Sequence, residues 1–132
     1  MSESSLVLFV CLHASAKSLI AMEYFNQLAA ERRLPFRALS VGTEPDDAVP
    51  PHVVMGMKAD GFDVSRRKPQ RLTKDVASPA RVAVSFGPDL AGFVAPTCRV
   101  EQWDVPAVSD DYAIARTAIK ARVDGLISKL VE

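Results

Sequence analysis

The first eighteen residues contain the feature that most restricts how this chain can fold. Five consecutive apolar residues, 6–10, predict a strand that is buried on both faces. Cys11 ends this run, the small residues 14–16 follow it, and apolar residues then recur at helical spacing from Leu19 onward. The sequence therefore predicts a strand, a tight loop and a helix in direct succession.

A strand, a tight loop and a helix in this order form a binding site for anions. The unpaired N–H groups and the positive dipole end of the helix converge on the loop. A cysteine in such an electropositive loop is favoured as a thiolate and acts as a nucleophile. The alternative is that Cys11 is a small buried hydrophobic residue at the end of a strand. The position of Cys11 is compatible with both interpretations.

The rest of the chain alternates between strand and helix patterns. The predicted strands lie at 6–10, 36–41, 81–86 and 99–103, and the predicted helices lie at 17–32, 52–60, 73–77 and 112–130. Such alternation predicts an α/β fold with a parallel sheet, and the anion loop then lies at the carboxyl ends of the strands, where these folds bind ligands. We expect a single domain over residues 1–132, in which helices flank a four-stranded parallel sheet.

Composition excludes several classes of protein. The 132 residues are 48% hydrophobic and 24% charged, which is ordinary for a globular domain with a proper core. Sixteen basic and sixteen acidic residues balance, so the charge indicates no binding to nucleic acid or to a membrane, and no apolar run is long enough to span one. Two cysteines form no disulfide framework, and no basic segment precedes residues 6–12 as in a signal peptide. We therefore expect a cytoplasmic protein.

Residues 11–18, Cys-Leu-His-Ala-Ser-Ala-Lys-Ser, also resemble a known family. They are similar to the phosphate-binding loop of low-molecular-weight protein tyrosine phosphatases and of the arsenate reductases that share their fold. The family pattern is Cys, five residues, Arg, then Ser or Thr, and the reductase version often reads Cys-x-His-Asn-Ser-Ala-Arg-Ser. The chain departs from it at Ala14, where the family has Asn, and at Lys17, where it has Arg. It agrees at Cys11, His13, Ser15, Ala16 and Ser18.

The resemblance implies a role for each residue of the loop. Cys11 would be the nucleophile that attacks the phosphorus or arsenic of a bound oxyanion, and Ser18 would donate a hydrogen bond to its thiolate. Lys17 would stabilise the oxyanion, but without the planar fork by which Arg matches phosphate geometry. If position 14 requires a left-handed backbone, alanine is unfavourable there by about 1–2 kcal/mol. The anion-binding loop would comprise Leu12, His13, Ala14, Ser15, Ala16 and Lys17.

Three of these positions also have plainer interpretations. Lys17 is equally compatible with a residue of the first helical turn that faces solvent. The hydroxyl of Ser18 is a suitable partner for the backbone donors at the start of the helix. His13 is a candidate for contact with the substrate, and the alternative is a packed or surface histidine.

The general acid of the family is missing from its expected place. An Asp-Pro pair would follow a segment like 101–106, and this chain has Ala107 and Val108 there. Loss of a positioned acid removes about 10²–10⁴-fold in rate. The remaining candidates are Asp104, Asp110 and Asp111, although the last two are more simply explained as charges at the start of the final helix.

Reductases of this fold that are coupled to thioredoxin need two further cysteines after the third strand. This chain has one other thiol, Cys98, so a complete relay is excluded. A partial relay through Cys98 and resolution by an external thiol are both open, and the plainer alternative is that Cys98 is a buried spectator.

No metal site or cofactor is predicted, since His13 and His52 lack ligand spacing and neither GxxxxGK[ST] nor GxGxxG occurs. Three functions fit the pattern. The first is an enzyme that hydrolyses phosphomonoesters or reduces an oxyanion through Cys11. The second is a catalytically silent anion-binding or regulatory module, and the third is a phosphocarrier. The expected ligand is phosphate, arsenate or a phosphomonoester, including a phosphoprotein, and the sequence indicates no oligomeric state.

Overall fold

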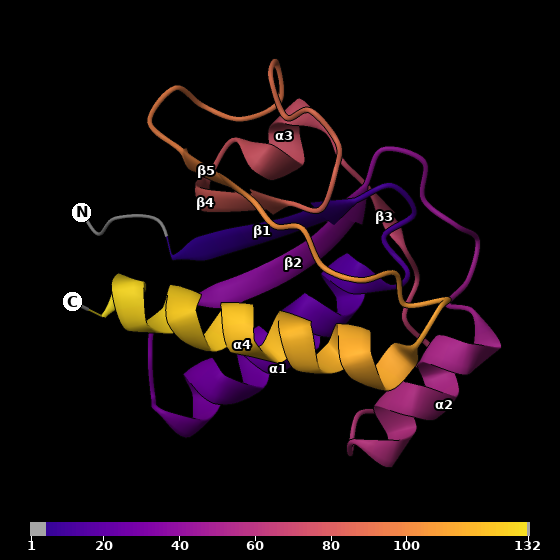
Figure 1. Cartoon of the computed structure of the whole chain (residues 1–132). Helices are drawn as coiled ribbons and strands as arrows, with labels where there is room; N and C mark the ends of the chain where they lie inside the picture. The colour runs from indigo at the N-terminus through magenta and orange to yellow at the C-terminus, as the bar shows by residue number, and fades with distance from the viewer. Residues whose placement is uncertain (1–4, 132) are drawn as a thin grey trace.

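The computed structural model describes residues 5–131 of the chain. Its helices are α1 (Lys17–Glu31), α2 (Pro51–Ala59), α3 (Lys74–Ala77) and α4 (Tyr112–Leu130). Its strands are β1 (Leu6–Cys11), β2 (Arg37–Gly42), β3 (Gln70–Arg71), β4 (Ala80–Ser85) and β5 (Arg99–Gln102). Helices and strands alternate along most of the chain, as predicted (Figure 1). No helix in this part of the chain is long and apolar enough to cross a bilayer.

Within residues 5–131, five strands run parallel in one sheet, in the order β3-β2-β1-β4-β5. The predicted α/β fold is confirmed, but the described chain has five strands rather than four. The additional strand, β3, pairs Gln70 with Val41 and Arg71 with Gly42. Both of its residues are exposed at the edge of the sheet. Such a short polar segment has no apolar pattern, so periodicity does not reveal it.

Strand β1 lies at the centre of the sheet, and this position explains its composition. It pairs with β2 on one side and with β4 on the other, so all six of its residues are buried. Cys11 lies beside Gly42 at the ends of β1 and β2, and Val10 lies beside Ser85 at the end of β4. The loop that follows Cys11 therefore opens at the carboxyl edge of the sheet, where α/β folds bind ligands.

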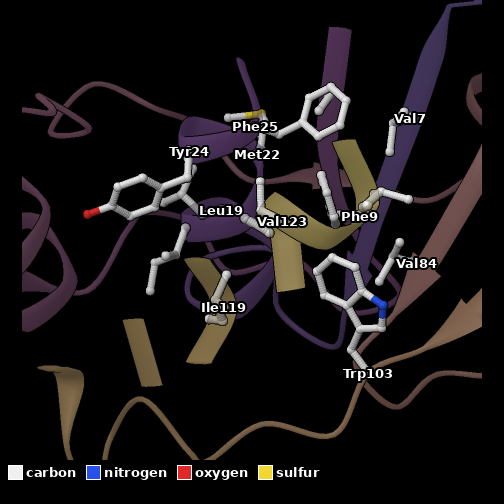
Figure 2. Packing of buried hydrophobic residues seen from close by; sticks show 14 of the residues in the cluster. Val7, Phe9, Leu19, Met22, Tyr24, Phe25, Val84, Trp103, Ile119 and Val123 are labelled. Carbon is white, nitrogen blue, oxygen red and sulfur yellow. The ribbon is translucent and has the colours of Figure 1, made fainter. Parts of the chain in front are cut away.

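Hydrophobic side chains cover both faces of the sheet. On one face, α1 and α4 pack against Val7 and Phe9 of β1 (Figure 1). The ring centroid of Phe9 is 5.9 Å from that of Phe25 and 5.7 Å from that of Trp103, which makes an aromatic centre to this layer (Figure 2). On the other face, the alternate residues of β1 pack in a second cluster that reaches α3. This packing fixes the strand that ends in Cys11.

A cluster of three polar side chains, Tyr24, Asp60 and Arg116, connects α1, the end of α2 and α4. The hydroxyl of Tyr24 donates to Asp60 Oδ2 at 3.0 Å, and Arg116 donates to both oxygens of the same carboxylate at 2.7 and 2.9 Å. In Figure 2 this hydroxyl points away from the apolar cluster. Burial raises the pKa of Tyr24 to about 12, and the hydrogen bond and charge of Asp60 act in the same direction.

We expect the folded chain to lose stability between about pH 10 and about pH 12. Below this range Tyr24 is neutral in both states, whereas within it the unfolded chain ionises first because its tyrosine pKa is the ordinary 10.0. The measurement is the urea midpoint of unfolding at about pH 9 and about pH 11, for the wild type and for Tyr24→Phe. The variant should lose less than the wild type over this interval, and equal losses would contradict the prediction.

Candidate active site

The thiol of Cys11 lies where β1 meets the loop before α1. Its Sγ is 2.9 Å from Ser18 Oγ, and Ser18 Oγ is 2.7 Å from Ser40 Oγ on β2. All three side chains are buried. The Ser18 hydroxyl bonds to the thiol rather than to the helix backbone, and helix α1 has no side-chain cap. Because a thiolate has no proton to give, Ser18 donates to an ionised Cys11 while Ser40 donates to Ser18.

The segment after β2 forms backbone hydrogen bonds to this loop. The N–H of Glu44 donates to the carbonyl of Leu12 at 2.7 Å, and the N–H of Asp46 donates to the carbonyl of His13 at 3.0 Å. Gly42 permits the close approach, since a Cβ at this position would lie 2.7 Å from the Leu12 carbonyl oxygen. The loop therefore fits against β2 only because position 42 carries no side chain.

Ala14 adopts a left-handed backbone, with a φ of 57°. This conformation is unfavourable for alanine by about 1–2 kcal/mol because its Cβ crowds the following carbonyl oxygen. Position 14, where the family has Asn, therefore does adopt the left-handed backbone that is unfavourable for alanine. Ala14 lies outside the lining of the cavity next to Cys11 and lines a second cavity of about 260 Å³, which Ser40 also lines.

A cavity of about 330 Å³ opens next to Cys11. Cys11 lines it together with five residues of the predicted anion-binding loop: Leu12, His13, Ser15, Ala16 and Lys17. Segments far away in the sequence supply the rest of the lining: Asp46, Pro50, His52, Phe86, Ala107, Val108 and Ser109. Among residues 5–131, no three His, Cys, Asp or Glu side chains gather as metal ligands would. The mixture of a thiol, an ammonium group and apolar walls suits an oxyanion attached to an apolar group.

Lys17 begins α1 and joins the loop to the segment after β5. Its Nζ donates to the carbonyl oxygen of Val105 at 3.1 Å. The side chain is partly buried and lines the cavity, so it is not the solvent-facing residue of the plainer interpretation. A positive charge therefore lies at the loop in the place of the family Arg, although part of its hydrogen-bonding capacity is used by the protein itself.

The described segment 103–111 brings no carboxylate to the cavity. Ala107 and Val108, at the Asp-Pro position of the family, line the cavity instead. The Oδ1 of Asp111 accepts from the N–H of Ile114 at 3.2 Å, which confirms that this aspartate caps α4. The three acid candidates are all exposed and lie outside the cavity lining: Asp104, Asp110 and Asp111.

The carboxylate of Asp46, which sequence reasoning missed, does contact the loop. The Oδ2 of Asp46 accepts from Ser15 Oγ at 2.6 Å, and its Oδ1 is 3.5 Å from His13 Nδ1. The same Nδ1 is 2.9 Å from the carbonyl oxygen of Glu44. Asp46 belongs to a turn-rich segment without a motif, so only the fold brings it to the loop. Ser40 was missed for the same reason, because a serine within a strand carries no signal of its own.

Cys98 does not lie near the cavity. It is buried in the cluster on the α3 face of the sheet, just before Arg99. Arg99 of β5 pairs with Val82 of β4, and Val82 pairs with Val7 of β1. This register separates Cys98 from Cys11 by about 15 Å along the strands, whereas a disulfide needs Cα atoms within about 7 Å. Burial also raises the pKa of the Cys98 thiol. The fold therefore does not bring the two thiols together.

The fold and the cavity define an α/β protein with a buried cysteine at a tight loop between the first strand and the first helix. The family model described as low molecular weight phosphotyrosine protein phosphatase matches residues 6–85. The chain belongs to this family. The matched region runs from β1 to the end of β4 and contains the whole loop together with Ser40 and Gly42.

Similar proteins include arsenate reductases and phosphatases. A putative arsenate reductase from Halobacterium salinarum is 28% identical over 97 residues, which cover 72% of this chain and 68% of that protein. An arsenate reductase from Archaeoglobus fulgidus has 26% identity and a TM-score of 0.74, covering 92% of this chain and 98% of that one. A low molecular weight protein tyrosine phosphatase from T. tengcongensis has a TM-score of 0.85 at 18% identity, covering 96% and 99%, and shows likeness of fold alone. The resemblance carried by residues 11–18 is confirmed.

Proposed function

We propose that this chain hydrolyses phosphomonoesters through a phosphate bound covalently to Cys11, at a rate reduced by its departures from the family pattern. The observation that carries the proposal is the buried hydrogen-bond chain from Cys11 through Ser18 to Ser40, next to a cavity of about 330 Å³. These hydrogen bonds hold the sulfur nucleophile at the cavity and supply a donor to its thiolate.

The reaction has two steps. In the first, the Cys11 thiolate attacks phosphorus and the ester oxygen leaves. In the second, water attacks the phosphocysteine and the thiolate returns, again stabilised by Ser18. The loop N–H groups and Lys17 stabilise the negative charge on the phosphoryl oxygens. Lysine supplies a point charge rather than a fork, so this stabilisation is weaker than in relatives with Arg.

The cavity walls favour an aryl ester as the substrate. Leu12, Phe86 and Val108 give one part of the cavity an apolar lining next to the loop. An aromatic ring buried there would keep its phosphate at the loop, which suits a small aryl phosphate or a phosphotyrosine of a protein.

Both cysteines are free thiols, which suits a cytoplasmic location.

The test of the proposal is to trap phosphate on Cys11. The protein is mixed with p-nitrophenyl phosphate, quenched in acid during turnover and mapped by mass spectrometry. Release of nitrophenol with phosphate on Cys11 supports the proposal, and turnover without this adduct contradicts it. Absence of turnover, with inorganic phosphate still protecting Cys11 from alkylation, would instead indicate a silent anion-binding module. Phosphate that stays on Cys11 until an acceptor is added would indicate a phosphocarrier.

Arsenate reduction is the second candidate, because the relative from Halobacterium salinarum is described as a putative arsenate reductase. The separation of Cys98 from Cys11 favours an external thiol as the reductant. The Cys11 thiolate would first attack arsenic and form a sulfur–arsenic bond with loss of water. The external thiol would then attack the Cys11 sulfur, which releases arsenite and leaves a mixed disulfide, and a second thiol would free Cys11 and end as the disulfide of the two external thiols. The test is arsenate-dependent oxidation of an added thiol by the wild type and Cys98→Ser. Equal rates are expected, and loss in the variant would indicate a relay through Cys98.

Replacing Lys17 with arginine is expected to raise kcat for p-nitrophenyl phosphate by about tenfold. The guanidinium group can form two parallel hydrogen bonds to the phosphoryl oxygens, whereas the ammonium group also bonds to Val105. The measurement is kcat together with inhibition by inorganic phosphate, and Lys17→Met should lower both the rate and the affinity for phosphate. An unchanged rate in Lys17→Arg would indicate that Lys17 serves only to hold Val105.

A further inference from the structure

The proposed reaction needs a proton donor for the leaving group, and the described segment 103–111, which would carry this donor in the family, brings no carboxylate to the cavity. Besides Cys11, the titratable side chains that line the cavity in the described chain are His13, Lys17, Asp46 and His52. Lys17 already donates to the carbonyl of Val105. Among the two histidines, only His13 has its ring orientation fixed by polar contacts that the structure shows.

His13 is held through its Nδ1 atom. Nδ1 is 2.9 Å from the carbonyl oxygen of Glu44, and since a carbonyl oxygen only accepts, Nδ1 carries a proton. Asp46 Oδ1 lies 3.5 Å from the same nitrogen and forms an ion pair with the ring when both nitrogens are protonated. Nε2 is therefore the atom that gains and loses a proton. The carbonyl and the carboxylate at Nδ1 fix the ring of a residue that lines the cavity, and they leave Nε2 as the nitrogen available for proton transfer.

Asp46 is itself held on the loop and is not the donor. Its Oδ2 accepts from the hydroxyl of Ser15 at 2.6 Å, and Ser15 is only 2% exposed. Its backbone N–H donates to the carbonyl of His13 at 3.0 Å. The carboxylate therefore accepts a hydrogen bond from Ser15, the backbone of Asp46 donates one to His13, and together they hold the carboxylate beside the imidazole.

We propose that His13 protonates the leaving group in the first step of the reaction, which rests on the phosphomonoester hydrolysis proposed above. As the bond from Cys11 sulfur to phosphorus forms, the ester P–O bond breaks, and the leaving oxygen takes its electron pair together with the Nε2 proton. In the second step, neutral His13 accepts a proton from the attacking water, the S–P bond breaks and Cys11 returns as a thiolate. Asp46 is a positioning residue, because it acts on the ring and not on the substrate.

The experiment compares two esters whose leaving groups differ in their need for a proton. p-Nitrophenyl phosphate releases a weakly basic oxygen, and phenyl phosphate releases a more basic one. For the full chain, His13→Asn is expected to lose about 10²-fold more kcat/KM, which reports the step that releases the leaving group, with phenyl phosphate than with p-nitrophenyl phosphate. Asp46→Asn should show a smaller difference in the same direction. His52→Asn is the matched control, since His52 lines the same cavity, and it should change both rates by the same factor.

The outcomes separate this proposal from the hydrolytic function itself. Equal losses with the two esters in His13→Asn would overturn the role of His13, while Cys11-dependent turnover by the wild type would leave the function intact. The same leaving-group dependence in His52→Asn would also overturn it. Inhibition by inorganic phosphate at the wild-type concentration shows that the loop of His13→Asn is intact. If the wild type hydrolyses neither ester, the proposed function fails and the role of His13 fails with it.

Discussion

Serine at position 11 is expected to lower the turnover of p-nitrophenyl phosphate by about 10⁴-fold or more, as loss of a nucleophile does in enzymes that act through a covalent intermediate. A hydroxyl is far less ionised than a thiol and forms no comparable nucleophile. The oxygen of Cys11→Ser can still bond to Ser18, so the loop should keep its shape and bind inorganic phosphate. The measurements are kcat and the inhibition constant for phosphate.

The matched control for this experiment is Cys98→Ser. Cys98 is the other free thiol of the chain and lies in the cluster on the α3 face, away from the cavity. Its replacement should leave turnover at the wild-type level. Activity that survives in Cys11→Ser would contradict the assigned nucleophile, and activity that disappears in a folded Cys98→Ser would show that the second thiol takes part in the chemistry.

Alanine at position 42 is expected to lower turnover by about 10²-fold, because a displacement of the reacting groups by about 1 Å has an effect of this size. The added Cβ would lie 2.7 Å from the Leu12 carbonyl oxygen and 2.8 Å from the Ala14 nitrogen. Both are backbone atoms of the loop, so the loop itself must move away from β2. The measurement is kcat for p-nitrophenyl phosphate, with thermal unfolding to show that Gly42→Ala is folded.

Gly125→Ala provides the comparison for this variant. Gly125 lies within α4, and a Cβ there would meet no atom within 4 Å. The substitution should therefore keep full activity and raise stability by about 0.5–1 kcal/mol, as alanine does relative to glycine inside a helix. Turnover by Gly42→Ala at the level of Gly125→Ala would show that the loop does not depend on its close contact with β2.

The sequence was sufficient to predict the central strand and the loop, because both depend on local patterns. Residues 6–10 are apolar without interruption, as expected of a strand with parallel neighbours on both sides, and Cys11 follows them directly. The helix pattern from Tyr112 to Leu130 was equally clear, since one face of α4 is buried along its length. Strand β3 was missed because two exposed polar residues carry no periodicity.

The surroundings of the loop could not be predicted in the same way. Ser40 and Asp46 reach the loop through parallel pairing and a turn, and neither position stands out in the sequence. The direction of the Lys17 side chain depends on the carbonyl of Val105, a residue 88 positions away. Contacts of this kind depend on tertiary structure, whereas motif and period describe only neighbours along the chain.

The location of Cys11 at the end of β1 has a consequence for motion in the molecule. Central strands of a sheet exchange their amide hydrogens only through global opening, whereas surface segments open locally at much lower free energy. The sulfur is attached to the part of the chain that opens last, while the segments after β2 and β5, which supply other walls of the cavity, are loops. We therefore expect the walls to rearrange more readily than the end of β1, which keeps the Cys11 sulfur in register with the sheet.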